Sequence, residues 1–150
     1  MALYYLETSA LVKLYVFELG TERLLGLTST EVANRFAILS LARVEFRAAI
    51  RRRERAGEVS NAIAGQLIAA FDRHSEGRFL VQPLSDSILD TSLILIDAYA
   101  LRAYDAIQLA GYLGLRSISG REEPVFVCAD RTLLSAAVNE GCPVLDPSAP

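Results

Sequence analysis

The sequence predicts a three-layer α/β/α domain with a short, mostly parallel central sheet. Short apolar runs of strand length alternate with longer segments whose apolar residues recur at helical spacing. Strands that alternate with helices in this way form parallel sheets covered on both faces. No repeat, low-complexity segment or linker interrupts the 150 residues, so we expect a single domain over 1–150, with 146–150 as a flexible tail.

The pattern places each element as follows. We expect strands over about 2–6, 36–39, 79–81, 125–128 and 144–145. We expect helices over about 8–15, 21–27, 40–56, 61–74, 85–98, 104–113 and 131–139. Polar residues at helix starts are expected N-caps: Thr8 or Ser9, Ser40, Ser85 and Asp130. Glycines are expected to end several helices, among them Gly114.

Composition narrows the chemistry that this chain can perform. No apolar run approaches the roughly 20 residues of a membrane span, and the N-terminal residues lack the features of a signal peptide, so we expect a cytoplasmic protein without membrane contact. His74 is the only histidine, which excludes a His-rich zinc site and disfavours a Ser-His-Asp triad. Cys128 and Cys142 lack CxxC spacing, and Cys128 fits a reduced core thiol. The reactive groups must therefore be carboxylates.

Four acids occupy positions that deserve explanation. Glu7 and Asp130 each follow a predicted strand, and ligands bind beyond the carboxyl ends of strands in open α/β sheets. Glu45 falls on the apolar face of its helix, and Asp105 lies near the start of a strongly apolar helix. Each has a structural explanation: a helix cap for Asp130, the helix dipole for Asp105, and an ion pair with Arg52 for Glu45. The cap explanation fits Glu7 less well, because Thr8 and Ser9 are better capping residues.

Together the four acids indicate a site for Mg²⁺ or Mn²⁺. Carboxylates gathered in one place repel each other unless a cation neutralises them, and all-oxygen ligands favour these hard ions over zinc. Pairs of such ions drive in-line displacement at phosphodiesters. A carboxylate cluster without a Walker loop therefore indicates metal-dependent phosphoryl chemistry.

The ordered motifs resemble the PIN-domain family, specifically VapC-type ribonuclease toxins of type II toxin–antitoxin pairs. The resemblance lies in "YYLETSALVKLY", "LARVEFRAAI", "LRAYDAIQLA" and "FVCADRTLLSAAVNEG", which span the chain in order. It implies a PIN-like fold and a Mg²⁺- or Mn²⁺-dependent endoribonuclease held inactive by a cognate antitoxin. It also implies a homodimer. The implied catalytic and metal-binding residues are Glu7, Glu45, Asp105 and Asp130, with Thr8 or Ser9 assisting through a hydroxyl.

One position departs from the family pattern. The first acid of the family is normally Asp, and Glu7 is longer by one methylene, about 1.5 Å. Because Mg²⁺ demands near-ideal geometry, we expect weakened rather than abolished metal binding. The alternative is a catalytically weak or inactive PIN-like module that binds antitoxin or RNA.

Two surfaces have open interpretations. Arg47, Arg51, Arg52 and Arg53 form the densest basic segment and fit either an RNA backbone track or a solvated helix end. The segment "NAIAGQLIAAF" fits either a groove for an antitoxin helix or part of the core.

Two other classes of α/β protein also carry acids at strand ends. A receiver-like domain needs a lysine after a late strand, and a haloacid-dehalogenase-like phosphatase needs DxD after its first strand. The chain has neither.

Overall fold

The computed structural model describes all residues, 1–150, and its five strands form one parallel sheet in the order β3-β2-β1-β4-β5. The strands are β1 (Leu3–Leu6), β2 (Arg35–Leu39), β3 (Phe79–Gln82), β4 (Val125–Val127) and β5 (Val144–Leu145). The chain begins in the central strand, adds β2 and β3 on one side, and then crosses over to add β4 and β5 on the other. The predicted parallel sheet is confirmed.

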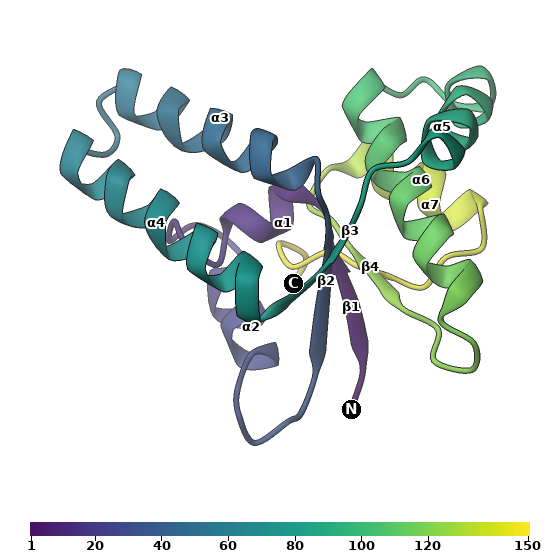
Figure 1. Cartoon of the computed structure of the whole chain (residues 1–150), viewed down its shortest axis with the longest axis horizontal. Coiled ribbons are helices and arrows are strands. Elements are labelled where there is room, and N and C mark those ends of the chain that lie inside the picture. The colour runs from purple at the N-terminus through teal and green to yellow at the C-terminus, as the bar shows by residue number, and fades with distance from the viewer.

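Helices cover both faces of this sheet, as predicted. They are α1 (Thr8–Val12), α2 (Thr21–Leu27), α3 (Ala42–Arg55), α4 (Asn61–Gly77), α5 (Asp86–Ala98), α6 (Ala103–Ile118) and α7 (Arg131–Asn139). Figure 1 shows α1, α3 and α4 on one side of the sheet and α5, α6 and α7 on the other. One apolar cluster fills each interface. From α4, Ala64, Ile68 and Phe71 enter the first cluster, so the main apolar residues of "NAIAGQLIAAF" are core.

Alternation along β1 divides its side chains between the two cores. Tyr5 joins the cluster under α5, α6 and α7, whereas Leu6 joins the cluster under α1, α3 and α4. The Tyr5 ring packs against Tyr112 at 5.9 Å and Phe126 at 5.8 Å between centroids. Burying one such ring contributes about 1.5–3 kcal/mol. Tyr5 is therefore fixed in the core two residues before Glu7.

Three local predictions are wrong, and tertiary contacts explain two of them. Glu7, not Thr8 or Ser9, is the N-cap of α1, which ends early at Val12. Ser40 does not cap α3, because its hydroxyl accepts a hydrogen bond from the Leu84 backbone N–H instead. Helix α6 continues past Gly114 to Ile118, and Gly114 lies where a Cβ would come within 3.0 Å of the Gln82 side chain. The caps at Ser85 and Asp130 are confirmed.

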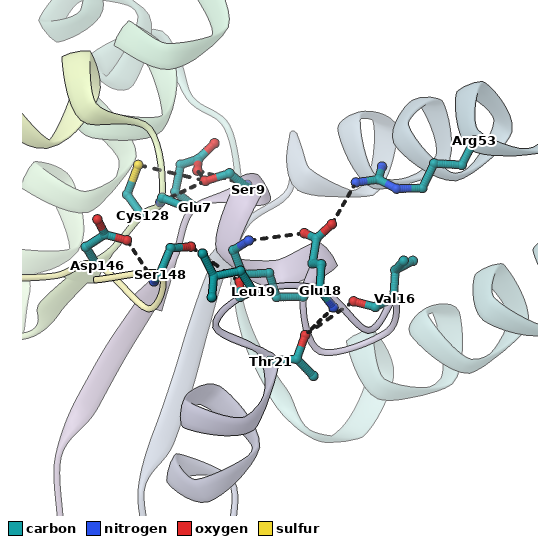
Figure 2. Close-up of polar contacts among 12 residues, drawn as sticks. Glu7, Ser9, Val16, Glu18, Leu19, Thr21, Arg53, Cys128, Asp146 and Ser148 are labelled. Carbon is teal, nitrogen blue, oxygen red and sulfur yellow. Dashed lines mark hydrogen bonds and ion pairs between the residues drawn. The ribbon is translucent and has the colours of Figure 1, made fainter. Parts of the chain in front are cut away.

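Residues 146–149, which we expect to form a flexible tail, contact the start of α2. Pro147 is buried, and the Ser148 hydroxyl donates to the Leu19 carbonyl at 3.3 Å (Figure 2). Gly20 has φ +96°, and a Cβ there would lie 2.7 Å from the Pro147 carbonyl oxygen. A glycine is thus required for this contact. None of the helices combines the length and the apolar character needed to cross a lipid bilayer.

Candidate active site

Glu7 and Asp130 lie beyond the carboxyl ends of two adjacent strands, at the point where the sheet reverses its strand order. Strands β1 and β4 are adjacent, and the helices that follow them, α1 and α7, go to opposite faces. This divergence opens the crevice in which ligands of parallel α/β sheets bind. Both acids cap their helices: Glu7 Oε2 accepts from the Ser9 backbone N–H at 2.9 Å, and Asp130 Oδ1 accepts from Leu133 at 2.9 Å.

A cavity of about 790 Å³ opens between α1, α3 and the start of α6. Three of the four predicted acids line it: Glu7, Glu45 and Asp105, together with Thr8 and Ser9. Asp130 does not line it. The structure thus brings three acids and both hydroxyls from distant segments to one cavity, with the fourth acid at its edge.

Glu7 is a buried carboxylate that forms no ion pair with a basic side chain. Its side chain is 4% exposed, and burial raises its pKa to about 7. Hydrogen bonds from the Ser9 hydroxyl and backbone N–H lower the pKa, whereas the charge of Glu45 raises it further. The Ser9 hydroxyl also accepts from the Ala129 backbone N–H at 3.0 Å, which ties the end of β1 to the end of β4. Figure 2 shows the contacts of Ser9 with Glu7 and Cys128. The charged form of Glu7 is therefore only partly stabilised by the protein.

Glu45 is held by two side-chain donors. Its Oε1 accepts from Gln108 Nε2 at 2.6 Å and from the Thr8 hydroxyl at 2.9 Å. Burial raises the pKa of Glu45, these hydrogen bonds oppose the shift, and the charge of Asp105 adds to it. No ion pair joins Glu45 to Arg52, so the expected structural partner is absent.

Sequence reasoning missed Arg102 and Gln108. Arg102 Nε donates to Asp105 Oδ2 at 3.0 Å, and its terminal nitrogen lies 3.6 Å from Asp130 Oδ2. The spacing of three residues before Asp105, at a helix start, was the available signal. Gln108 is fully buried, and the signal was a lone amide inside the apolar run "AIQLAGYL", since a buried amide needs partners.

Most of the predicted RNA-binding arginines already have carboxylate partners. The ion pairs are Arg47 with Asp72 at 3.3 Å, Arg51 with Glu54 at 2.8 Å and Arg53 with Glu18 at 3.4 Å. Glu18 also pairs with Lys13 at 3.2 Å. Arg52 has no carboxylate partner and lines the cavity with Lys13 and Arg53. The cavity is therefore lined by both acidic and basic side chains, with Glu18 pairing with Lys13 and Arg53. Arg47 and Arg51 do not line it.

The donor set fits a hard divalent cation in its chemistry. One oxygen of each cavity carboxylate is tied to a protein donor, while Glu7 Oε1, Glu45 Oε2 and Asp105 Oδ1 accept no hydrogen bond from a nitrogen or oxygen donor. Burial raises the pKa of the Cys128 thiol, so this neighbour of Ser9 stays a poor ligand. In the arrangement seen, no three acidic, histidine or cysteine side chains are placed to share one ion.

The sequence itself matches no protein-family model and no curated protein. Solved structures do match. A toxin–antitoxin complex from Klebsiella pneumoniae contains a chain with TM-score 0.64 at 16% identity, over 96% of this chain and 97% of that one. The complex VapBC-1 from nontypeable Haemophilus influenzae gives 0.63 at 14% identity, over 98% and 99%. A protein from Pyrobaculum aerophilum gives 0.62 at 25% identity, over 95% and 83%.

These likenesses extend over nearly the whole chain and agree with the fold that the four motifs implied. The all-parallel sheet and the helices on both of its faces belong to that architecture. The chain has the PIN-like fold found in VapC-type toxin chains.

Proposed function

We propose that this chain is a metal-dependent endoribonuclease, the toxin component of a toxin–antitoxin pair. One observation carries the proposal: three carboxylates from separate elements line one cavity, and the most buried of them, Glu7, forms no ion pair with a basic side chain of the protein. A group left in this condition is typical of functional sites, because structure alone would neutralise it.

The residues that line the cavity would have the following roles. Glu7, Glu45 and Asp105 would hold Mg²⁺ or Mn²⁺, which when bound supplies an activated water and stabilisation of the leaving oxygen. The hydroxyls of Ser9 and Thr8 orient Glu7 and Glu45. The expected products carry 5′-phosphate and 3′-hydroxyl ends.

Asp130 contributes from the edge of the cavity. It fixes the start of α7 and pairs with Arg102, which in turn holds Asp105. We therefore assign Asp130 a smaller role than the three acids that line the cavity.

The basic side chains that line the cavity support RNA as the substrate. Lys13, Arg52 and Arg53 line the same space as the acids, and Arg52 is free of carboxylate partners. They would bind a phosphate next to the scissile one, since phosphate contacts supply most nucleic-acid affinity.

The partners follow from the likeness to other proteins. One of the matching structures is described as a toxin–antitoxin complex and another as VapBC-1, which supports an antitoxin partner for this chain. The homodimer implied by the motif resemblance stays a prediction. Helix α5 exposes Leu93 and Ile94, which a partner surface would cover.

A second candidate, a PIN-like module with little or no cleavage activity, is favoured by three observations. Glu7 replaces the family's Asp and has one oxygen committed to capping α1. Arg102 already neutralises Asp105 and Asp130. No three acids share one ion position. Such a module would bind antitoxin or RNA through the same surfaces.

Cleavage of labelled RNA in Mn²⁺, compared with the same reaction in chelator, tests the proposal. Asp105→Asn should remove at least about 90% of the Mn²⁺-dependent rate, because it removes one of the cavity anions. The matched control is Asp97→Asn, which changes an exposed acid of α5 and should leave the rate unchanged. Cleavage that survives both chelator and Asp105→Asn would contradict the mechanism.

Glu7→Asp separates the two candidates. If the longer side chain attenuates a working enzyme, restoring Asp should raise the rate by about tenfold through better ion geometry. Equal rates for Glu7 and Asp would refute attenuation. No Mn²⁺-dependent cleavage by either protein would favour the non-cleaving module.

A further inference from the structure

A chain of buried hydrogen bonds runs from the aromatic core to the cavity. The Tyr5 hydroxyl donates to Gln108 Oε1 at 2.8 Å. Gln108 Nε2 then donates to Glu45 Oε1 at 2.6 Å and to the Thr8 hydroxyl at 3.2 Å, and that hydroxyl donates to the same Glu45 oxygen at 2.9 Å. Tyr5 and Gln108 are both 0% exposed. Two donors, Gln108 and Thr8, thus converge on one carboxylate oxygen, and Tyr5 is linked to that oxygen through Gln108.

The partners at the two ends of this hydrogen-bond chain, Tyr5 and Glu45, determine which way the Gln108 amide faces. The Glu45 carboxylate accepts hydrogen bonds only, so it requires the amide nitrogen on its side. The Tyr5 hydroxyl needs an acceptor for its proton, and the amide oxygen on the other side provides one. A reversed amide would place an oxygen against the carboxylate and leave the buried Tyr5 proton without an acceptor. The orientation of Gln108 is therefore strongly determined by Tyr5 and Glu45 together.

Gly111 provides the space for this arrangement. A Cβ at position 111 would lie 2.6 Å from the Tyr5 hydroxyl oxygen and 3.2 Å from the Leu39 side chain. A glycine inside a helix is less stable than alanine by about 1 kcal/mol. A phenylalanine at position 5 and an alanine at position 111 would suit an apolar core better. The sequence instead keeps a hydroxyl and the glycine that accommodates it.

We propose that Gln108, oriented by Tyr5, is a positioning residue for Glu45. By tying Oε1 of Glu45 to the core, Gln108 leaves Oε2 as the oxygen available to a divalent cation in the cavity. This inference rests on the proposed metal-dependent function and adds the residues that set the geometry of the ligand. Partners of this kind typically change metal affinity or activity by about 10–100-fold when they are removed.

The test compares two tyrosines in one core. Tyr5→Phe removes the hydroxyl that orients Gln108, and Gln108→Met removes the amide at similar length. Tyr112→Phe is the matched control, because Tyr112 packs against Tyr5 but its hydroxyl donates to the Pro124 carbonyl at 2.6 Å, away from Glu45. The readouts are the Kd of Mn²⁺ by titration calorimetry, the kcat and KM for RNA cleavage, and the Tm without metal.

We expect Tyr5→Phe and Gln108→Met to weaken Mn²⁺ binding and lower kcat by about tenfold or more, with KM for RNA unchanged. Tyr112→Phe should lower Tm by a similar amount to Tyr5→Phe and leave Kd and kcat unchanged. If Tyr5→Phe matches Tyr112→Phe in Kd and kcat while the unmodified protein binds Mn²⁺ and cleaves, the positioning role is refuted and the proposed function stands. Tyr5→Phe retains the packed ring and decides the question even if Gln108→Met does not fold. If the unmodified protein neither binds Mn²⁺ nor cleaves, both are refuted.

Discussion

Glu7 and Asp130 have the same local role and opposite electrostatic surroundings. Each follows a central strand of the sheet and accepts a hydrogen bond from a backbone N–H in the first turn of the next helix. Glu7 is 4% exposed, is repelled by Glu45 and has no ion pair. Asp130 is half-buried and lies 3.6 Å from the Arg102 guanidinium. Asp130 therefore forms an ion pair and Glu7 does not, although both cap a helix in the same way.

The difference indicates where a cation would have the largest effect. A helix cap explains the position of both acids, but only Asp130 also forms an ion pair, with Arg102 at 3.6 Å, whereas Glu7 forms none. A divalent cation would gain most at the Glu7 side of the crevice, together with Glu45 and Asp105. Asp130 would act through Arg102.

The largest expected effect is on the rate of RNA cleavage, which should depend more on Glu7 than on Asp130. Glu7→Gln and Asp130→Asn both keep an oxygen that can cap the helix, so both proteins should fold. We expect Glu7→Gln to lower Mn²⁺-dependent RNA cleavage by about 100-fold or more, because a ligand charge is lost, and Asp130→Asn by about tenfold or less. Initial rates at saturating Mn²⁺ measure both. A larger loss from Asp130→Asn would reverse the assignment.

The second expected effect is a pH dependence of stability to which the buried Glu7 contributes. Its folded pKa of about 7 lies above its ordinary value of 4.5, so between these values the folded state binds more protons than the unfolded state. The free energy of unfolding of the metal-free protein should therefore fall as pH rises through this window, by on the order of 3 kcal/mol from Glu7. The raised pKa of Glu45 acts in the same direction.

Urea unfolding in chelator from about pH 5 to pH 7.5 measures this slope. Glu7→Gln should reduce it, and Mn²⁺ at pH 7.5 should recover the lost stability. A slope that is the same in Glu7→Gln would show that the burial of Glu7 has no energetic consequence.

The smallest expected effect concerns Arg102, the positively charged side chain next to Asp130. Arg102→Gln removes the guanidinium that pairs with Asp105 and Asp130 in an exposed position, its side chain being 81% exposed. We expect Mn²⁺ binding to strengthen by about twofold to fivefold, in line with the small energies of exposed ion pairs. Titration calorimetry measures the change. Weaker binding would mean that Arg102 supports the site instead of competing with the ion.

Much of the fold followed from pattern because the spacing of apolar residues and the positions of caps and glycines are local signals. The helices over 21–27 and 131–139 and the strand over 144–145 were predicted with their observed bounds, and the parallel sheet followed from the alternation of elements. The boundaries at Ser40 and Gly114 were wrong because contacts with the distant residues Leu84 and Gln82 override local capping preferences. The docking of Pro147 beneath Gly20 has the same origin.

The candidate site divides in the same way. The sequence by itself determined that acids follow two strands and occupy two helices, because strand ends and helix faces can be counted along the chain. Only the tertiary structure decided which acid is compensated, since Arg102 reaches Asp130 across 28 residues and Gln108 reaches Glu45 across 63. The pKa of a buried carboxylate depends on the charges and dipoles within a few ångströms, and those neighbours are chosen by folding rather than by sequence order.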